Sequence, residues 1–148
     1  WPWTAKKGTK VDPTVLDVKV DGHAFAWNRT DRDWINSPTS AEEVGSIHTV
    51  QGYDLNYAGV IIGRDLYYDA DAGKIRLDRA NYFDARGKEN NKLRGRTYSD
   101  DEILAMVKNA YNVLLTRGMR GTYLYVCDPA LRERLRPMFP PAPRADAR

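Results

Sequence analysis

Apolar and polar residues alternate with a period of two in two short segments near the start of the chain. Residues 16–20 alternate throughout, and residues 24–28 follow the pair Asp21-Gly22, which is typical of tight hairpin turns. Residues 29–40 are mainly polar and are expected to form a loop. The pattern therefore predicts two half-buried strands joined as a hairpin, followed by irregular chain.

Two apolar runs follow in the middle of the chain. Residues 44–48 predict a short buried strand, and residues 49–55 predict a single helical turn after it. Residues 59–63 are apolar on both faces, which is typical of a parallel strand that helices cover. Residues 67–69 and 74–77 predict a hairpin inserted after that strand.

The later part of the chain contains a segment with helical periodicity. Ser99 can cap its start, and Glu102 stands at the spacing of a capping box. One apolar stripe with a period of 3.6 comprises Ile103, Val107, Ala110, Tyr111 and Leu114. The helix is expected to end near Arg117, because a glycine follows.

A strand and a last helix are expected after this segment. Residues 122–126 predict the strand. Asp128 and Pro129 suit the cap and the first position of the helix, and Pro137 is expected to end it.

The order of these elements predicts the fold class. Strand, helix, strand, insertion, helix, strand and helix indicate an α/β domain with a mostly parallel sheet flanked by helices. We expect this domain to span residues 15–137, with an irregular segment at 1–14 and a disordered tail at 138–148.

Size and composition fit one globular domain. The chain has 148 residues, 42% of them hydrophobic, and its net charge of +3 permits a nucleic-acid partner without requiring one. No apolar run approaches the ~20 residues of a membrane helix. Cys127 is the only cysteine, so no intrachain disulfide can form, and a buried structural thiol in a reduced, cytoplasmic setting is the simplest interpretation. Because the chain begins at Trp1 rather than at Met, we expect a piece excised from a larger protein.

Several kinds of chemistry lack their sequence signals. His23, His48 and one cysteine cannot supply an ordinary zinc site without carboxylates, so no metal site is expected. The chain has no G-x-S-x-G elbow. The pairs Gly73-Lys74 and Gly87-Lys88 are not followed by Ser or Thr, so neither is a P-loop.

The first candidate site follows the strand expected at 44–48. Ligands gather at the carboxyl ends of parallel strands, and backbone amides at a helix start favour phosphate. The polar or conformationally permissive residues here are Ser46, His48, Thr49, Gln51, Gly52 and Asp54. The ordinary alternative is a partly buried histidine with a satisfied partner and a surface glutamine.

The second candidate site is the end of the helix that precedes the 122–126 strand. Arg117 would project from a glycine-containing loop, where its fork of donors could reach the γ-phosphate of a nucleotide held by another surface. The ordinary alternative is an arginine that interacts with the helix dipole beside a glycine cap.

A basic run from Arg86 to Arg96 includes Lys92 and Arg94. It could follow a phosphate backbone, although such a run in an insertion is usually a solvated loop. The four tryptophans could stack on bases but are more often core or partner-facing residues.

Taken together, the two candidate stretches resemble motifs V and VI of superfamily-1 helicases. Residues 46–54, S-I-H-T-V-Q-G-Y-D, are similar to the motif V pattern T-x-H-x-x-K/Q-G-L/Y/F-E/D. Residues 112–118, N-V-L-L-T-R-G, are similar to motif VI, which is usually Y-V-A-L-T-R-A. A closer resemblance is to bacterial Schlafen-like DNA/RNA helicase domains, through residues 59–66 and 109–125. It covers roughly residues 15–136.

This resemblance implies the second, RecA-like domain of an ATP-dependent nucleic-acid motor, a P-loop NTPase fold. ATP and Mg²⁺ would lie between it and an N-terminal RecA-like domain of the same longer chain, which would bring the P-loop. Arg117 would be the arginine finger. The nucleotide would be bound by Gln51, Gly52, Asp54 and Arg120. The nucleic acid, a single strand, would be bound by Ser46, His48, Thr49, Lys92 and Arg94.

Three positions depart from the general helicase pattern. Ser46 replaces Thr and keeps the hydroxyl, Asp54 replaces the commoner Glu and shortens its reach, and Asn112 replaces a Tyr and removes its ring.

Because the P-loop is missing, we expect the chain alone to be inactive. A non-enzymatic nucleic-acid-binding module and a degenerate helicase-like domain for protein contacts are the alternatives. Dimers through surface exposed by truncation are also expected.

Overall fold

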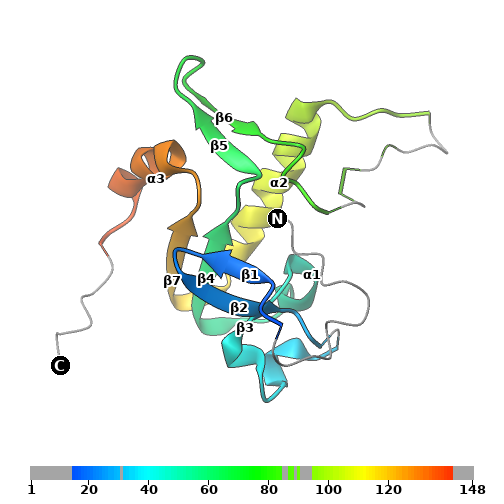
Figure 1. Cartoon of the computed structure of the whole chain (residues 1–148), viewed down its shortest axis with the longest axis vertical. Coiled ribbons are helices and arrows are strands. Elements are labelled where there is room, and N and C mark those ends of the chain that lie inside the picture. The colour runs from blue at the N-terminus through cyan, green and yellow to red at the C-terminus, as the bar shows by residue number, and fades with distance from the viewer. Residues whose placement is uncertain (1–14, 31, 85–86, 89, 91–94, 142–148) are drawn as a thin grey trace. The chain divides into compact units, whose positions relative to one another are not determined.

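The computed structural model describes residues 15–30, 32–84, 87–88, 90 and 95–141. They form two compact units, divided between Leu55 and Asn56, and each unit is described by itself. In the described ranges, the first unit carries β1 to β3 and the helical turn α1. The second carries β4 to β7 and the helices α2 and α3 (Figure 1).

The expected opening hairpin is confirmed. β1 (Val18–Val20) and β2 (His23–Trp27) pair in antiparallel fashion, with Val20 opposite His23. Asp21 and Gly22 have φ angles of 43° and 80°. Glycine adopts this left-handed region without steric cost and Asp tolerates it, so the turn closes as the pair predicts.

The strand expected at residues 44–48 is partly wrong. β3 (Glu43–Val44) is short and pairs with β2 in parallel, and α1 (Ile47–Val50) follows. Ser46 has an extended backbone, and its carbonyl accepts from the amides of Thr49 and Val50, each at 3.1 Å. Ile47 and His48 are therefore helical, because these backbone hydrogen bonds to Ser46 start a turn before the apolar run can extend along β2.

The polar stretch before β3 is a loop with two short 3₁₀ turns, η2 (Trp34–Asn36) and η3 (Ser40–Glu42). Trp34 is 8% exposed, so this loop contributes a large ring to the interior of the first unit.

In the second unit, β4 (Leu55–Ile62) pairs with β7 (Gly118–Val126). The amide of Cys127 donates to the carbonyl of Ile62 at 3.0 Å, and the two strands point the same way (Figure 1). Ala58, Val60 and Ile62 are buried, whereas Gly59 is exposed. β4 is therefore buried along one face within the described residues, and not along both as its apolar run suggested.

The expected insertion is a hairpin, as predicted. β5 (Leu66–Asp69) and β6 (Lys74–Leu77) pair in antiparallel fashion, with Leu66 opposite Leu77. Both leucines are buried, so the hairpin presents an apolar face to the core of the second unit.

α2 (Asp100–Leu115) begins with the expected capping box. Ser99 Oγ accepts from the Glu102 amide at 3.3 Å, and the Ser99 amide donates to Glu102 Oε2 at 2.9 Å. The loop expected after the helix is shorter than predicted, because β7 begins at Gly118. Only Thr116 and Arg117 connect the two elements.

α3 (Pro129–Leu135) begins as expected, with Asp128 Oδ1 accepting from the Leu131 amide at 2.7 Å. It ends at Leu135, two residues before Pro137, as predicted, and Pro137 lies in the following 3₁₀ turn, η5 (Arg136–Met138). A proline is tolerated there because an amide in the first turn needs no intrahelical partner.

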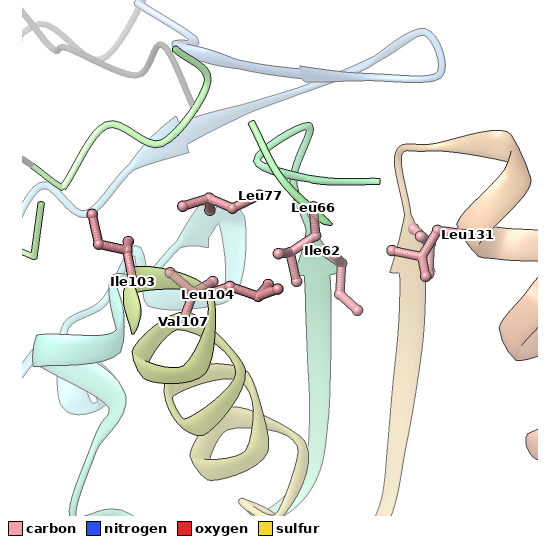
Figure 2. Close-up of a cluster of buried hydrophobic side chains, with 8 residues drawn as sticks. Ile62, Leu66, Leu77, Ile103, Leu104, Val107 and Leu131 are labelled. Carbon is pink, nitrogen blue, oxygen red and sulfur yellow. The ribbon is translucent and has the colours of Figure 1, made fainter. Parts of the chain in front are cut away.

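Buried side chains from β4, β5, β6, α2, β7 and α3 form the core of the second unit. They gather around the start of α2 and the carboxyl ends of β4 and β7 (Figure 2). The cluster comprises Ile62, Leu66, Leu77, Ile103, Leu104, Val107, Val126 and Leu131. The stripe expected on α2 is thus buried at Ile103 and Val107, and Leu104 widens it.

The chain is a mixed α/β protein, but its described strands do not join one mostly parallel sheet. They form three small sheets, β1-β2-β3, β4-β7 and β5-β6. Each of these sheets lies within one unit, so the described residues do not form the single sheet that the element order suggested.

Residues 1–14 and 142–148 lie outside the described residues, and with them the expected irregular segment and most of the expected tail. Within the described ranges, no helix combines the length and the apolar character that a membrane crossing requires.

Candidate functional site

The α1 turn, which carries most of the first candidate residues, is tied to the end of β2 by Asn28. The amide oxygen of Asn28 lies 2.6 Å from Thr49 Oγ1 and accepts from the Ser46 amide at 3.4 Å. The Ser46 and Thr49 hydroxyls are 3.2 Å apart. Asn28 is only 5% exposed, so this link is shielded from water and fixes the turn on the sheet.

This link separates the candidates into two sets. The side chains of Ser46 and Thr49 are partly buried and engaged within the protein. The exposed residues of the same stretch are His48, Gln51, Gly52 and Asp54. Gly52 has a φ angle of 90°, which a side chain would strain, so it allows the chain to reverse after α1. The turn therefore presents an imidazole, an amide and a carboxylate outward.

Sequence reasoning missed Asn28. Its φ of 33° is one that asparagine tolerates better than most residues, and its place just after a strand is a weak signal for that conformation. Nothing local indicates a partner 21 residues away.

A buried carboxylate organises the loop beneath this turn. Glu43 is 9% exposed and accepts from Trp34 Nε1 at 2.8 Å, from the Arg29 amide at 2.9 Å, and from the Thr39 hydroxyl. Burial raises the pKa of Glu43, but the hydrogen bonds from Thr39, Arg29 and Trp34 and the charge of Arg29 outweigh it. The pKa therefore lies below its usual value of 4.5.

Gly45 lets the turn pack closely on Trp34. A Cβ at Gly45 would lie 2.8 Å from the Trp34 ring and 2.9 Å from a methyl of Val50. Any larger residue would push the indole or α1 away.

The pH dependence of this loop gives one prediction. A carboxyl whose folded pKa is depressed stabilises the protein above its unfolded pKa, and the effect is lost as pH falls through the folded pKa. The first unit should therefore lose stability as pH falls below 4.5. Glu43→Gln should weaken this dependence and cost about 1–3 kcal/mol at pH 7. Urea unfolding followed by tryptophan fluorescence across pH measures both.

Glu42→Gln is the matched control, because Glu42 is the exposed neighbour in the same turn. Its stability should follow that of the unchanged protein at every pH. An equal response of the two variants would contradict the role of Glu43.

Arg117 lies at the carboxyl end of α2 and is partly exposed. Its Nε donates to the carbonyl of Val113 at 3.1 Å, and the last turn of α2 contains no basic residue of its own. The contact anchors the stem of the side chain on a helix end with partial negative charge, so the interaction expected as the ordinary alternative is present. The guanidinium is nevertheless not sealed inside the protein.

Arg120 lies in β7, whereas the sequence predicted that it would lie in the loop before this strand. It is exposed, and its guanidinium carbon lies 5.8 Å from the centre of the Tyr57 ring. The early start of β7 explains the difference, because the strand begins at Gly118, four residues before the predicted start at residue 122.

The remaining candidates are distributed as follows. The α1 turn belongs to the first unit and Arg117 to the second. Lys92 and Arg94 lie outside the described residues.

A polar cluster that the sequence did not indicate lies at the carboxyl end of β4. Asp65 is 5% exposed and accepts from the Tyr111 hydroxyl, whose oxygen is 3.1 Å and 3.2 Å from its two carboxyl oxygens. The same hydroxyl accepts from the Gly63 amide at 3.1 Å. Burial raises the pKa of Asp65, and burial and then the charge of Asp65 raise the pKa of Tyr111.

No group of three or more metal-ligating side chains occurs in the described part of the chain. Cys127 is a partly buried thiol, and its backbone amide donates to the carbonyl of Ile62 in β4.

Comparison with known proteins identifies a family. The family model described as Schlafen group 3, DNA/RNA helicase domain matches residues 1–128. A Saccharomyces cerevisiae protein, called "Uncharacterized protein YPL245W", is 44% identical over 119 residues, which is 78% of this chain and 26% of that protein. The chain thus spans about a quarter of the length of this relative. No solved structure matches.

Proposed function

This chain belongs to the Schlafen group 3 DNA/RNA helicase domain family, and on that basis we propose that it is the second, RecA-like motor domain of an ATP-dependent helicase or translocase. It completes an ATP site whose P-loop and Mg²⁺ ligands come from an N-terminal domain of the same longer chain. Its other role is to grip a single strand of nucleic acid, in the cytoplasm. The observation that carries this proposal is the family match over residues 1–128.

Arg117 acts as the arginine finger in this proposal. Its partial exposure and the bond from Nε to the Val113 carbonyl support it, because the stem is oriented while the side chain stays accessible. A guanidinium fork stabilises the charge that develops on the transferred phosphoryl group.

The α1 turn acts as the coupling element. The Asn28 link holds it rigidly on the sheet, which supports a turn that contacts ligand through its exposed residues. Gln51, Gly52 and Asp54 face the nucleotide, and His48 faces the nucleic acid. Ser46 and Thr49 contribute mainly by fixing the turn. Closing on ATP and opening after hydrolysis then move the two motor domains along the strand.

ATP hydrolysis by the full-length protein tests this proposal. We expect hydrolysis that single-stranded DNA or RNA stimulates. The 148-residue chain alone should neither bind ATP tightly nor hydrolyse it, because its sequence lacks a P-loop. A coupled phosphate-release assay on both proteins measures this, and turnover by the shorter chain would contradict it.

A non-enzymatic binding module is the second candidate, favoured by the basic run from Arg86 to Arg96. A salt titration of strand binding separates the two functions. The module is supported if Lys92→Ala and Arg94→Ala abolish binding while the full-length protein has no ATPase activity.

A further inference from the structure

One face of the β4-β7 sheet carries exposed aromatic rings. Tyr57 on β4 is 55% exposed and Tyr123 on β7 is 52% exposed. Side chains alternate along β4, and Ala58 and Val60 point to the buried side, so Tyr57 points away from the core. The two rings lie on the same face, with their centres 6.4 Å apart and their planes tilted by 40°.

Two further residues of β7 complete this surface. The guanidinium of Arg120 lies 5.8 Å from the centre of the Tyr57 ring, within the range of a cation–π contact. A Cβ at Gly121 would lie 3.4 Å and 3.5 Å from two carbons of that ring. A larger side chain at Gly121 would therefore cover the ring, and glycine leaves it open. We call Tyr57, Arg120, Gly121 and Tyr123 the tyrosine face.

We propose that the tyrosine face is a stacking platform for the bases of a single-stranded nucleic acid, with Arg120 beside the backbone phosphates. This rests on the proposed function for the class of ligand. Aromatic rings bind any base through its π-face, and a cation next to them attracts the phosphates.

The spacing of the rings favours an extended single strand over a duplex. Stacked bases of B-form DNA rise by about 3.4 Å per nucleotide, and base faces inside a duplex are covered by their neighbours. Rings 6.4 Å apart instead suit two bases that have separated from each other. The proposal gives Arg120 a nucleic-acid contact in place of the nucleotide contact that the family resemblance implied.

Binding of fluorescein-labelled oligothymidylate and oligouridylate to the nucleotide-free, full-length protein tests this, with fluorescence anisotropy as the readout. Tyr57→Ala and Tyr123→Ala should each raise Kd by about 5- to 150-fold, the equivalent of about 1–3 kcal/mol per stacked base. Tyr57→Phe should bind within about twofold of the unchanged protein, because a phenyl ring still stacks. Arg120→Ala should reduce the salt slope by about 1.

Gly121→Val tests the same surface while both tyrosine rings remain. It should also weaken oligonucleotide binding, because the valine side chain would cover the Tyr57 ring. Phe139→Ala is the matched control, an exposed aromatic residue of the same unit after η5. Its affinity should be unchanged.

Two results would overturn the proposal: alanine variants that bind as tightly as the unchanged protein, or an equal loss in Phe139→Ala. If the face packs against another part of the longer protein, the alanine variants will lower Tm and leave oligonucleotide affinity unchanged, which also overturns it. ATP is absent from the assay, so this outcome is independent of Arg117 and of the proposed motor activity.

Discussion

Arg117→Ala in the full-length protein is expected to lower ATP turnover by about 10³-fold or more, with far less effect on nucleotide affinity. An arginine finger contacts charge that develops only in the transition state, so its loss appears in kcat and not in ground-state binding. Steady-state ATPase kinetics give the turnover, and titration with a fluorescent ATP analogue gives the affinity.

If the only role of Arg117 is the hydrogen bond from its Nε to the Val113 carbonyl at the end of α2, the expected result is different. In that case the variant should lose about 0.3–1 kcal/mol of stability and keep normal turnover. Arg134→Ala, an exposed arginine on α3, controls for the loss of a surface charge and should leave turnover unchanged. Normal turnover in Arg117→Ala would falsify the finger assignment.

Tyr111→Phe is expected to destabilise the second unit by about 2–4 kcal/mol at pH 7. The change removes the hydroxyl that donates to the buried Asp65 carboxylate and accepts from the Gly63 amide. A buried carboxyl group and an amide would then be left without this partner in the interior, and that costs more than one hydrogen bond contributes. Urea unfolding followed by circular dichroism measures the loss.

The pH dependence gives this prediction a second readout. The Tyr111 hydroxyl lowers the pKa of Asp65 against the larger raising effect of burial, so its removal should raise that pKa further. A raised folded pKa favours the native state below the unfolded value, and the advantage is lost as pH rises through the folded value. The destabilisation of Tyr111→Phe should therefore be largest at neutral pH and smaller in acid.

Tyr123→Phe is the matched control, because it removes a hydroxyl from a half-exposed ring on β7. Its stability should change by less than about 0.5 kcal/mol. If Tyr111→Phe were as stable as this control at neutral pH, the Asp65 cluster would have no structural importance.

The effect of Tyr111 bears on function through the position of α2. Its hydroxyl joins α2 to the segment directly after β4, and Arg117 lies at the end of the same helix. Weakening the link should therefore loosen the helix that carries the proposed finger.

Local patterns in the sequence were enough for the elements whose signals lie within a few residues. Asp21-Gly22 formed the expected turn, Ser99 and Glu102 formed the expected capping box, and Asp128 capped α3. Each depends on backbone conformations or hydrogen bonds between near neighbours, which residue type alone largely decides. The sequence also indicated a resemblance to Schlafen-like helicase domains, and the family match over residues 1–128 agrees with that resemblance.

The tertiary structure decided what depends on distant partners. Asn28 meets Thr49 across 21 positions, and Tyr111 meets Asp65 across 46, so no local pattern indicates either pair. The same holds for Arg120, which was expected in a loop. It lies in β7, which pairs with β4, and its guanidinium is close to the Tyr57 ring. A buried polar group must find a partner wherever the fold brings one, and only the packed chain determines which residue that is.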